Sequence, residues 1–230
     1  MTSADIRLGR WQDVLADVDM VDCIVTDPPY SSRTHEGHNA MEEQTKALTG
    51  QATREAIRYD SWTPTDVSSF VGSFVGRVRG WWACMTSHDL IPSWESAYAA
   101  AGLYSFPPVV VIQKRPRLVG DGPSSWAVYM MVARPRGKPF STWGTLPGAY
   151  FSTTVKGSGI AGTKPLDLMC SIIRDYSRPG DLVCDPFVGS GTTAVAALSE
   201  GRRFVGSEAK PEHYEIAKRR LAKGYTPTMF

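Results

Sequence analysis

The chain has 230 residues, of which 42% are hydrophobic and 21% charged, and its formal net charge is +2. This length suits one domain with a buried α/β core, and the composition is typical of a soluble globular protein. The sequence has neither an apolar run near the roughly 18 residues of a membrane helix nor a charged-then-apolar leader, so we expect a cytoplasmic protein without a membrane partner. The cysteines lack disulfide or zinc spacing, so we expect buried, reduced thiols at Cys23, Cys84, Cys170 and Cys184.

Charge is distributed unevenly along the chain. Residues 1–30 carry six acidic and two basic side chains. Residues 114–138 carry one acidic side chain, Asp121, and six basic ones, which are Lys114, Arg115, Arg117, Arg134, Arg136 and Lys138. Such a basic stripe can hold a polyanion, although it can equally be the solvated edge of a strand-loop-strand unit.

The first half of the chain alternates short apolar runs with helical periods, as α/β sheets do. A strand over 21–26 runs into a double proline, which cannot continue a central strand. A polar loop over 31–60 has the length of a functional lid or binding loop. The next helix has Thr63 as N-cap and Pro64 as its first residue, and it closes at Gly80. We then expect a strand over 81–86, a helix over 92–101, and strands over 109–113 and 126–133 that pair with each other.

The second half contains the clearer pattern. Residues 135–162 are rich in Gly, Pro, Ser and Thr and predict no regular element. A helix then starts at 163–165 and buries Leu166, Met169, Ile173 and Tyr176. We expect a short buried strand over 182–184, a helix over 192–200, a strand over 204–206 and a final helix over 211–223.

A glycine-rich turn follows the strand at 182–184 and precedes the next helix. Gly189 and Gly191 allow the backbone to approach a ligand closely, and the helix that follows offers unpaired amides. Glu208 lies at the end of the next strand, where an acidic side chain can accept both ribose hydroxyls of a nucleoside cofactor. These features predict a nucleoside site at residues 185–193.

Two other ligand turns are alternatives. A phosphate-binding P-loop requires a lysine after its last glycine, and no lysine follows Gly191. A dinucleotide fingerprint has glycine at its sixth position, where this chain has Ala194. Variants with alanine at that position exist, so the dinucleotide alternative stays open.

The tetrapeptide Asp27-Pro28-Pro29-Tyr30 follows the first buried strand, at a place where α/β folds form ligand crevices. An exocyclic amine is a poor nucleophile because its lone pair is delocalised into the ring. The Asp27 carboxylate and the Pro28 carbonyl can both accept hydrogen bonds from it and free that lone pair, without a covalent intermediate. Pro29 stiffens the backbone, and the Tyr30 ring offers a surface on which an extruded base can stack.

Other chemistries fit the sequence less well. Cysteine-based attack on cytosine C5 typically uses a cysteine after proline, and none of the four cysteines follows one. The run His35-Glu36-Gly37-His38 misses the spacing of a zinc helix, so we expect no metal.

Taken together, these motifs resemble the β-class amino-methyltransferases of DNA. In that family the Asp-Pro-Pro-Tyr motif precedes the cofactor motif, a circular permutation that matches the order of 27–30 and 185–193 here. The family's Lys-Pro helix start matches Lys164-Pro165, and its acidic ribose ligand matches Glu208. Members usually have Gly-Asp near the N-terminal strand, where this chain has Gly9-Arg10 and Asp13 is the nearest acid.

The resemblance implies a Rossmann-like, doubly wound mixed α/β sheet of seven strands, one of them antiparallel, with a small target-recognition insertion. We expect one methyltransferase domain with a catalytic half at about 1–134, a recognition segment at 135–162 and a cofactor half at 163–223. The expected cofactor is S-adenosylmethionine, and the expected catalytic residues are Asp27, Pro28, Pro29 and Tyr30. The expected cofactor-binding residues are Lys164, Pro165, Asp185, Pro186, Phe187, Gly189, Ser190, Gly191, Thr192, Thr193 and Glu208.

The implied partner is double-stranded DNA, contacted by Lys114, Arg115, Arg117, Arg136 and Lys138 and by the loop at 31–60. Members often dimerise, so we expect a homodimer, and a cognate restriction endonuclease is a further candidate partner. Asp27 favours N6 of adenine as the target, because cytosine-N4 members more often carry Ser there. Methyltransferases of RNA or protein glutamine usually start the tetrapeptide with Asn. A non-catalytic DNA-binding module is the alternative outside enzymes.

Overall fold

The computed structural model describes residues 3–34, 36, 46, 60–117, 123–137, 143–153 and 163–223, with residues 115–117 described by their backbone alone. Its strands are β1 (Ala4–Leu8), β2 (Cys23–Thr26), β3 (Trp82–Thr86), β4 (Leu103–Ser105), β5 (Val109–Arg117), β6 (Ser125–Pro135), β7 (Ala149–Phe151), β8 (Leu182–Asp185) and β9 (Arg203–Glu208). Its helices are α1 (Trp11–Val14), α3 (Pro64–Phe74), the 3-10 helix η1 (His88–Leu90), α4 (Ile91–Ala100), α5 (Leu166–Tyr176), α6 (Thr192–Ser199) and α7 (Pro211–Ala222).

The described strands form one mixed sheet in the order β1-β9-β8-β2-β3-β6-β5-β7, and β4 also pairs with β6. Every described pair is parallel except the three that β6 makes with β3, β4 and β5. The Rossmann-like sheet with one antiparallel strand is therefore confirmed. The predicted count of seven is wrong, because the sheet has nine strands. The three-residue strands β4 and β7 are too short to produce a recognisable alternation.

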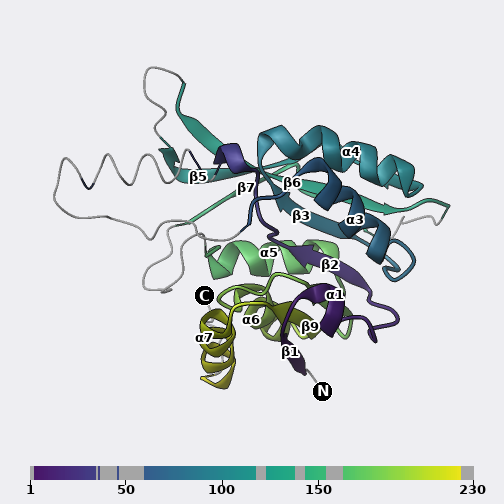
Figure 1. Cartoon of the computed structure of the whole chain (residues 1–230), viewed down its shortest axis with the longest axis vertical. Helices are drawn as coiled ribbons and strands as arrows, with labels where there is room; N and C mark the ends of the chain where they lie inside the picture. The colour runs from purple at the N-terminus through teal and green to yellow at the C-terminus, as the bar shows by residue number, and fades with distance from the viewer. Residues whose placement is uncertain are drawn as a thin grey trace.

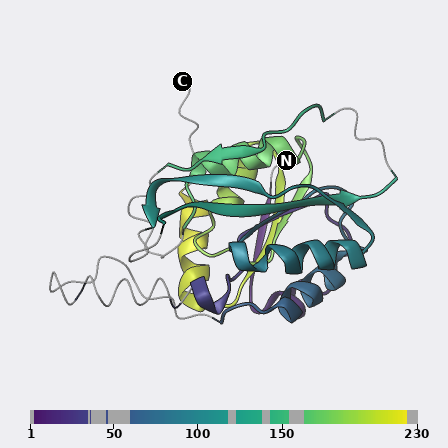
Figure 2. The same cartoon turned by 90° about the horizontal axis from the view of Figure 1, so that it is seen from above.

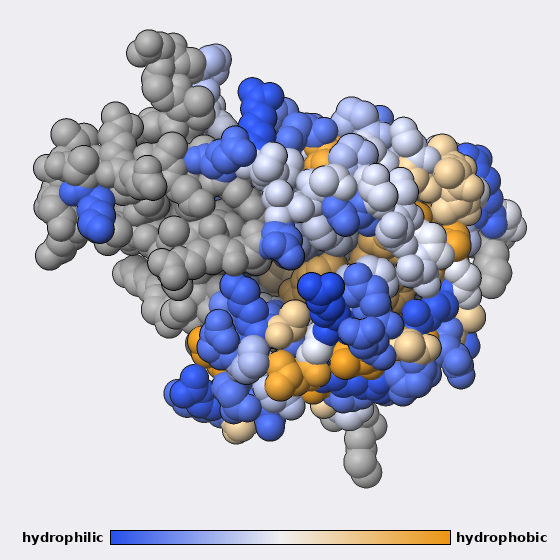
Figure 3. Space-filling model, viewed as in Figure 1, coloured by the Kyte–Doolittle hydropathy of each residue, from blue (hydrophilic) through white to orange (hydrophobic). Residues whose placement is uncertain are grey.

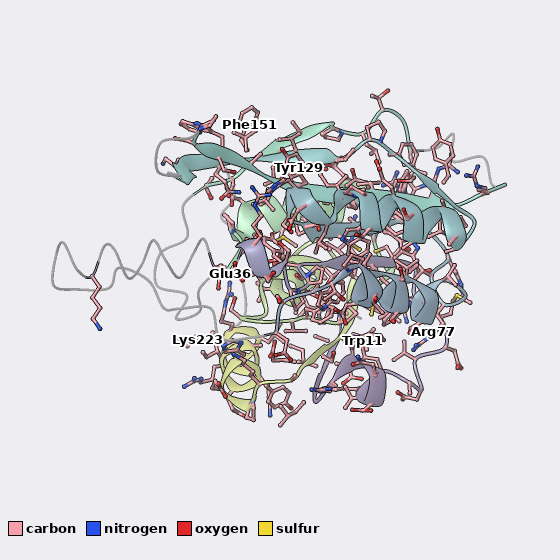
Figure 4. The ribbon with its side chains drawn as sticks, turned by 45° about the horizontal axis from the view of Figure 1, so that its top comes forward. Trp11, Glu36, Arg77, Tyr129, Phe151 and Lys223 are labelled. Atoms are coloured by element: carbon pink, nitrogen blue, oxygen red, sulfur yellow. The ribbon has the colours of Figure 1, made fainter. Side chains whose placement is uncertain are left out.

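Helices cover both faces of the sheet. One apolar cluster joins the sheet to α5, α6 and α7, and the other joins it to α1, α3 and α4. Figure 1 shows this division, and in Figure 2 the sheet separates α5 from α3 and α4. The short helix α1 packs against α3 through Trp11, whose ring lies 5.5 Å from Phe70. The segments that follow these two helices are joined by Arg77, whose Nε donates to Val18 O at 2.8 Å (Figure 4).

Helix α3 begins as its sequence predicts. Thr63 and Asp66 form a reciprocal capping box, in which the Thr63 amide donates to Asp66 Oδ2 at 2.8 Å. The helix ends at Phe74, before the predicted stop at Gly80. Residues 77–79 instead pair with Val21, whose amide donates to Arg77 O at 2.8 Å and whose carbonyl accepts from Arg79 N at 3.0 Å. This pairing with the start of β2 takes the backbone away from helix.

The four cysteines are free and buried, as expected. Burial raises the pKa of Cys84 to about 12, so its thiol is a poor nucleophile at neutral pH. Among the described residues, no helix is both long and apolar enough to cross a membrane. The loop expected at 31–60 falls mostly outside the described residues, as do His35, His38 and Lys138.

Candidate active site

The predicted catalytic and cofactor motifs meet at one edge of the sheet. Strand β8 lies between β2 and β9, and the three strands are parallel. Their carboxyl ends therefore place Asp27 after β2, the glycine-rich turn after β8 and Glu208 at the end of β9, side by side. This is the edge at which parallel α/β sheets form ligand crevices.

A buried hydrogen bond joins the two motifs directly. The Thr26 hydroxyl donates to Asp185 Oδ1 at 2.6 Å, and the Phe187 amide donates to the same oxygen at 3.0 Å. Asp185 is only 1% exposed, and burial raises its pKa to about 6 despite hydrogen bonds from Thr26, Thr193 and the Phe187 amide. The structure thus places Asp185 behind the turn, where it fixes the ends of β2 and β8 relative to each other.

The turn itself is held against Glu208. The Gly189 amide donates to Glu208 Oε2 at 2.8 Å, and the Lys210 amide donates to Oε1 at 2.9 Å. His213 Nδ1 lies 3.8 Å from the same Oε1. Because a carboxylate has about four lone-pair sites, these contacts leave acceptor capacity on Glu208.

These residues fit an adenosyl cofactor. Gly189 has a φ of +55°, and among the described residues a Cβ placed there would meet only the Phe187 carbonyl, at 4.0 Å, so no described side chain fills this side of the turn. Helix α6 begins just beyond, with Gly191 as its N-cap and no side-chain cap on its first amides. An acidic acceptor, an open glycine turn and uncapped amides are what a ribose and an amino-acid tail require.

An arginine from α7 supports the cofactor turn from behind. Arg220 Nη1 lies 2.9 Å from three acceptors, Ser190 O, Ser190 Oγ and Thr192 Oγ1. Burial lowers the pKa of Arg220. The sequence did not predict this contact, because Arg220 lies 30 residues beyond Ser190. The apolar pattern of α7 indicates which face of the helix is buried, but not which residues its polar side chains contact.

The catalytic tetrapeptide is built around the Asp27 carboxylate. The Tyr30 hydroxyl donates to Asp27 Oδ1 at 2.9 Å, and the Lys164 ammonium donates to Oδ2. The Trp62 amide donates to Tyr30 O at 2.9 Å, while its ring packs edge-on at 5.3 Å from Phe187. Trp62 therefore connects the tetrapeptide to the cofactor turn, and Phe187 serves in packing.

Lys164 lies with the catalytic residues, although the Lys-Pro motif predicts it as a cofactor ligand. Its side chain is 14% exposed, and its ammonium lies 5.4 Å from the centre of the Tyr30 ring. Thr163 bonds to the cofactor turn instead, through its hydroxyl to Ser190 Oγ at 3.2 Å. Pro165 is the N-cap of α5. The sequence did not predict this role for Thr163, because the bond joins residues that are 27 positions apart.

The structure separates two of the predicted DNA-contacting residues, Lys114 and Arg136. Exposed Lys114 lies on β5, which runs parallel to β3 and towards the catalytic edge. Exposed Arg136 follows the antiparallel strand β6 and so lies at the opposite end of the sheet. The structure describes Arg115 and Arg117 by their backbone alone, and Lys138 lies outside the described residues. Because β6 reverses direction, Lys114 and Arg136 lie at opposite ends of the sheet, and the other predicted DNA contacts stay predictions.

Outside this site, two features of the described residues bear on ligand binding, the hydropathy of one face and the grouping of metal-ligating side chains. The face in Figure 3 is largely hydrophilic, with hydrophobic residues gathered in small areas. No group of three or more His, Cys, Asp and Glu side chains in the described ranges could hold a metal ion. Asp13, the acid nearest to Gly9-Arg10, is exposed on α1, while the Gly9 amide donates to Glu208 O at 2.9 Å.

Comparison with known proteins agrees with this geometry. The family model N6_N4_Mtase, described as DNA methylase, matches residues 113–219. Over these residues, slightly less than half of its length, the chain is similar to the DNA methylases. The type II methyltransferase M2.LlaDCHI of Lactococcus lactis subsp. cremoris is 46% identical over 63 residues, which are 27% of this chain and 23% of that protein. The DNA adenine methyltransferase YhdJ of Escherichia coli (strain K12) is 47% identical over 58 residues, or 25% of this chain and 20% of that protein.

The likeness in fold extends over nearly the whole chain. The M1.HpyAVI–SAM complex superposes with a TM-score of 0.69 and 21% identity, covering 95% of this chain and 98% of that one. The sequence matches cover only about a fifth to a quarter of the two curated relatives. The family match leaves out Asp27 to Tyr30, so the assignment of the tetrapeptide depends on the geometry described above.

Proposed function

We propose that the protein is an S-adenosylmethionine-dependent DNA methyltransferase that methylates N6 of adenine in duplex DNA. The observation that carries the proposal is the 2.6 Å bond from Thr26 to Asp185, which fixes the Asp27 tetrapeptide beside the open glycine turn. The related DNA methylases and the likeness in fold to a SAM complex support the same reading. A non-catalytic DNA-binding module would have no need of this paired arrangement.

The chemistry follows from the groups at the sheet edge. When bound, S-adenosylmethionine supplies an electrophilic methyl group on sulfur. Asp27 and the Pro28 carbonyl accept hydrogen bonds from the target amino group, and the Tyr30 ring stacks on the extruded base. Transfer of that methyl group, in which an N–C bond would form as the S–C bond breaks, would leave the amine with an excess proton, for which Asp27 is the adjacent acceptor. Glu208 would hold the ribose of the cofactor, and Asp185 positions the turn.

Adenine N6 is favoured over cytosine N4 for two reasons. The tetrapeptide begins with Asp, where cytosine-N4 enzymes more often have Ser, and one of the relatives is named as a DNA adenine methyltransferase. The family model covers both chemistries in its name, so cytosine N4 is the second candidate.

The remaining parts of the proposal concern the surroundings of the site. Lys114 lies on the strand that runs towards the catalytic edge, so we place DNA there. The homodimer, a cognate endonuclease and a cytoplasmic location, where buried thiols stay reduced, belong to the same proposal. Analytical ultracentrifugation of the full chain at micromolar concentration tests the homodimer, which a single monomer mass would contradict.

The deciding experiment incubates the protein with methyl-tritiated S-adenosylmethionine and mixed-sequence duplex DNA, and then separates the nucleosides by chromatography. Label in N6-methyladenine is the expected result. Label in N4-methylcytosine would change the base and keep the mechanism. No label in DNA, with cofactor binding intact, would overturn the proposed function.

A further inference from the structure

Lys164 occupies the place at which the substrate base is expected to bind. Its ammonium donates to Asp27 Oδ2 and lies 5.4 Å from the centre of the Tyr30 ring. These are the two interactions that an adenine would make there, a hydrogen bond from its amino group and a stacking contact from its ring. An ammonium reproduces the first as an ion pair and the second as a cation–π contact.

We propose that Lys164 is a stand-in for the target base, which competes with it for Asp27 and must be displaced before the base can enter. The inference rests on the proposed function and goes beyond it, because it makes a residue of the Lys-Pro motif a determinant of base binding. Its side chain is 14% exposed and that of Asp27 is 26% exposed, so the pair is partly shielded from water. Such shielding strengthens the ion pair and thus the competition.

The position of Lys164 is set by its neighbour. The Thr163 hydroxyl donates to Ser190 Oγ at 3.2 Å, and Ser190 is held in turn by Arg220 at 2.9 Å. Helix α5 begins immediately after Pro165, so the backbone on the other side is also fixed. The ammonium is therefore held at Asp27 by an anchored segment, and only its side chain has to swing away.

The competition has a measurable consequence. Removing the ammonium leaves the Asp27 carboxylate with the Tyr30 hydroxyl as its described side-chain donor, so the amino group of the base becomes a more favourable partner. The affinity contributed by the base should rise. Removing the ammonium would also weaken any electrostatic attraction between residue 164 and DNA phosphates. That loss lowers the affinity for every duplex by the same factor, whether or not the target base is present.

A ratio of dissociation constants isolates the base from this background. The target adenine is first located by sequencing DNA methylated by the unaltered protein. Binding is then measured with a duplex that contains the adenine and with one that has an abasic site in its place. We expect the ratio of the abasic to the adenine Kd to rise at least threefold in Lys164→Met. Lys164→Arg, which retains the ion pair, should keep the original ratio.

Controls separate this inference from folding and from the proposed function. Lys218→Met removes an exposed lysine of α7 that lies over Tyr214, and it should leave the ratio unchanged. If Lys164→Met does not melt like the unaltered protein, Lys164→Gln replaces it. An unchanged or lower ratio in a folded variant overturns the inference. A protein that transfers no methyl group to DNA overturns the proposed function instead.

Discussion

Two turns at the catalytic edge begin with the same dipeptide, Asp-Pro, yet their aspartates differ in burial and in hydrogen-bond partners. Both follow neighbouring parallel strands, β2 and β8. The side chain of Asp27 is 26% exposed and faces Lys164 and Tyr30, whereas Asp185 is 1% exposed and accepts from Thr26. One carboxylate is available to a ligand and the other is committed to the fold. Burial and partners, more than the motif itself, therefore distinguish Asp27, the proposed catalytic aspartate, from Asp185.

Replacing Asp27 should have the largest effect on activity. Asp27→Ala removes the acceptor of the target amino group, so we expect kcat to fall by about 10³-fold. Melting temperature and cofactor Kd should stay close to those of the unaltered protein. Loss of cofactor binding together with activity would mean that Asp27 is structural, and would remove the contrast with Asp185.

The turn after β8 can be tested through Gly191, which has a φ of +81°. A Cβ at this position would lie 3.0 Å from Ala217 Cβ, whereas at Gly201, with a φ of +78°, it would meet nothing within 4 Å. Both Gly→Ala variants carry a backbone strain of about 1–2 kcal/mol. Gly191→Ala adds a clash between the turn and α7, so urea unfolding should place it about 1–2 kcal/mol below Gly201→Ala. Equal free energies of unfolding for the two variants would show that α7 can move aside without a cost in stability.

The buried carboxylate of Asp185 should make the free energy of unfolding depend on pH. The pKa of Asp185 is raised to about 6, while an unfolded aspartate titrates near about 3.9. The folded protein therefore binds more protons between these values, and the Asp185 contribution to stability falls as the pH rises from about 4 to 6 and then stays constant. Asp185→Asn lacks this penalty, so its free energy of unfolding relative to the unaltered protein should rise by about 1–3 kcal/mol over that window. Urea titrations at pH 4, 5, 6 and 7 measure the difference, and a difference independent of pH would contradict the prediction.

The smallest effect concerns DNA. Lys114→Gln should lower the slope of log K against log salt by about one, if Lys114 contacts one phosphate. Arg136→Gln is the matched control, because Arg136 is equally exposed but lies at the other end of the sheet. Equal losses for both variants would mean that DNA extends well beyond the catalytic edge.

Much of this architecture could be predicted from the sequence because its signals are local. The cap at Thr63, the buried face of α5 and the strand-turn-helix at 182–199 each lie within one short window of the chain. The brief strands β4 and β7 could not be predicted, because three residues give no periodicity. The early end of α3 was missed since it depends on pairing with Val21, which is distant in sequence.

In the candidate site, too, local motifs could be predicted from the sequence and contacts between distant segments could not. Motifs placed Asp27, Gly189 and Glu208 at one edge, because parallel strands end together. Sequence alone could not assign Lys164 to Asp27, which is 137 residues away, or Arg220 to Ser190. Nor could it separate Lys114 from Arg136, since that requires the direction of β6. Contacts between distant segments need the fold.

The reversal of β6 also affects how such a protein can diversify. Because β5 and β6 are antiparallel neighbours and Arg117 pairs with Ser125, β5 ends and β6 begins at the catalytic edge of the sheet. Insertions or deletions between Arg117 and Ser125 would therefore leave the pairing of β2, β3 and β8 unchanged. For the proposed methyltransferase, new recognition sequences could evolve between these strands while the transfer chemistry is inherited unchanged.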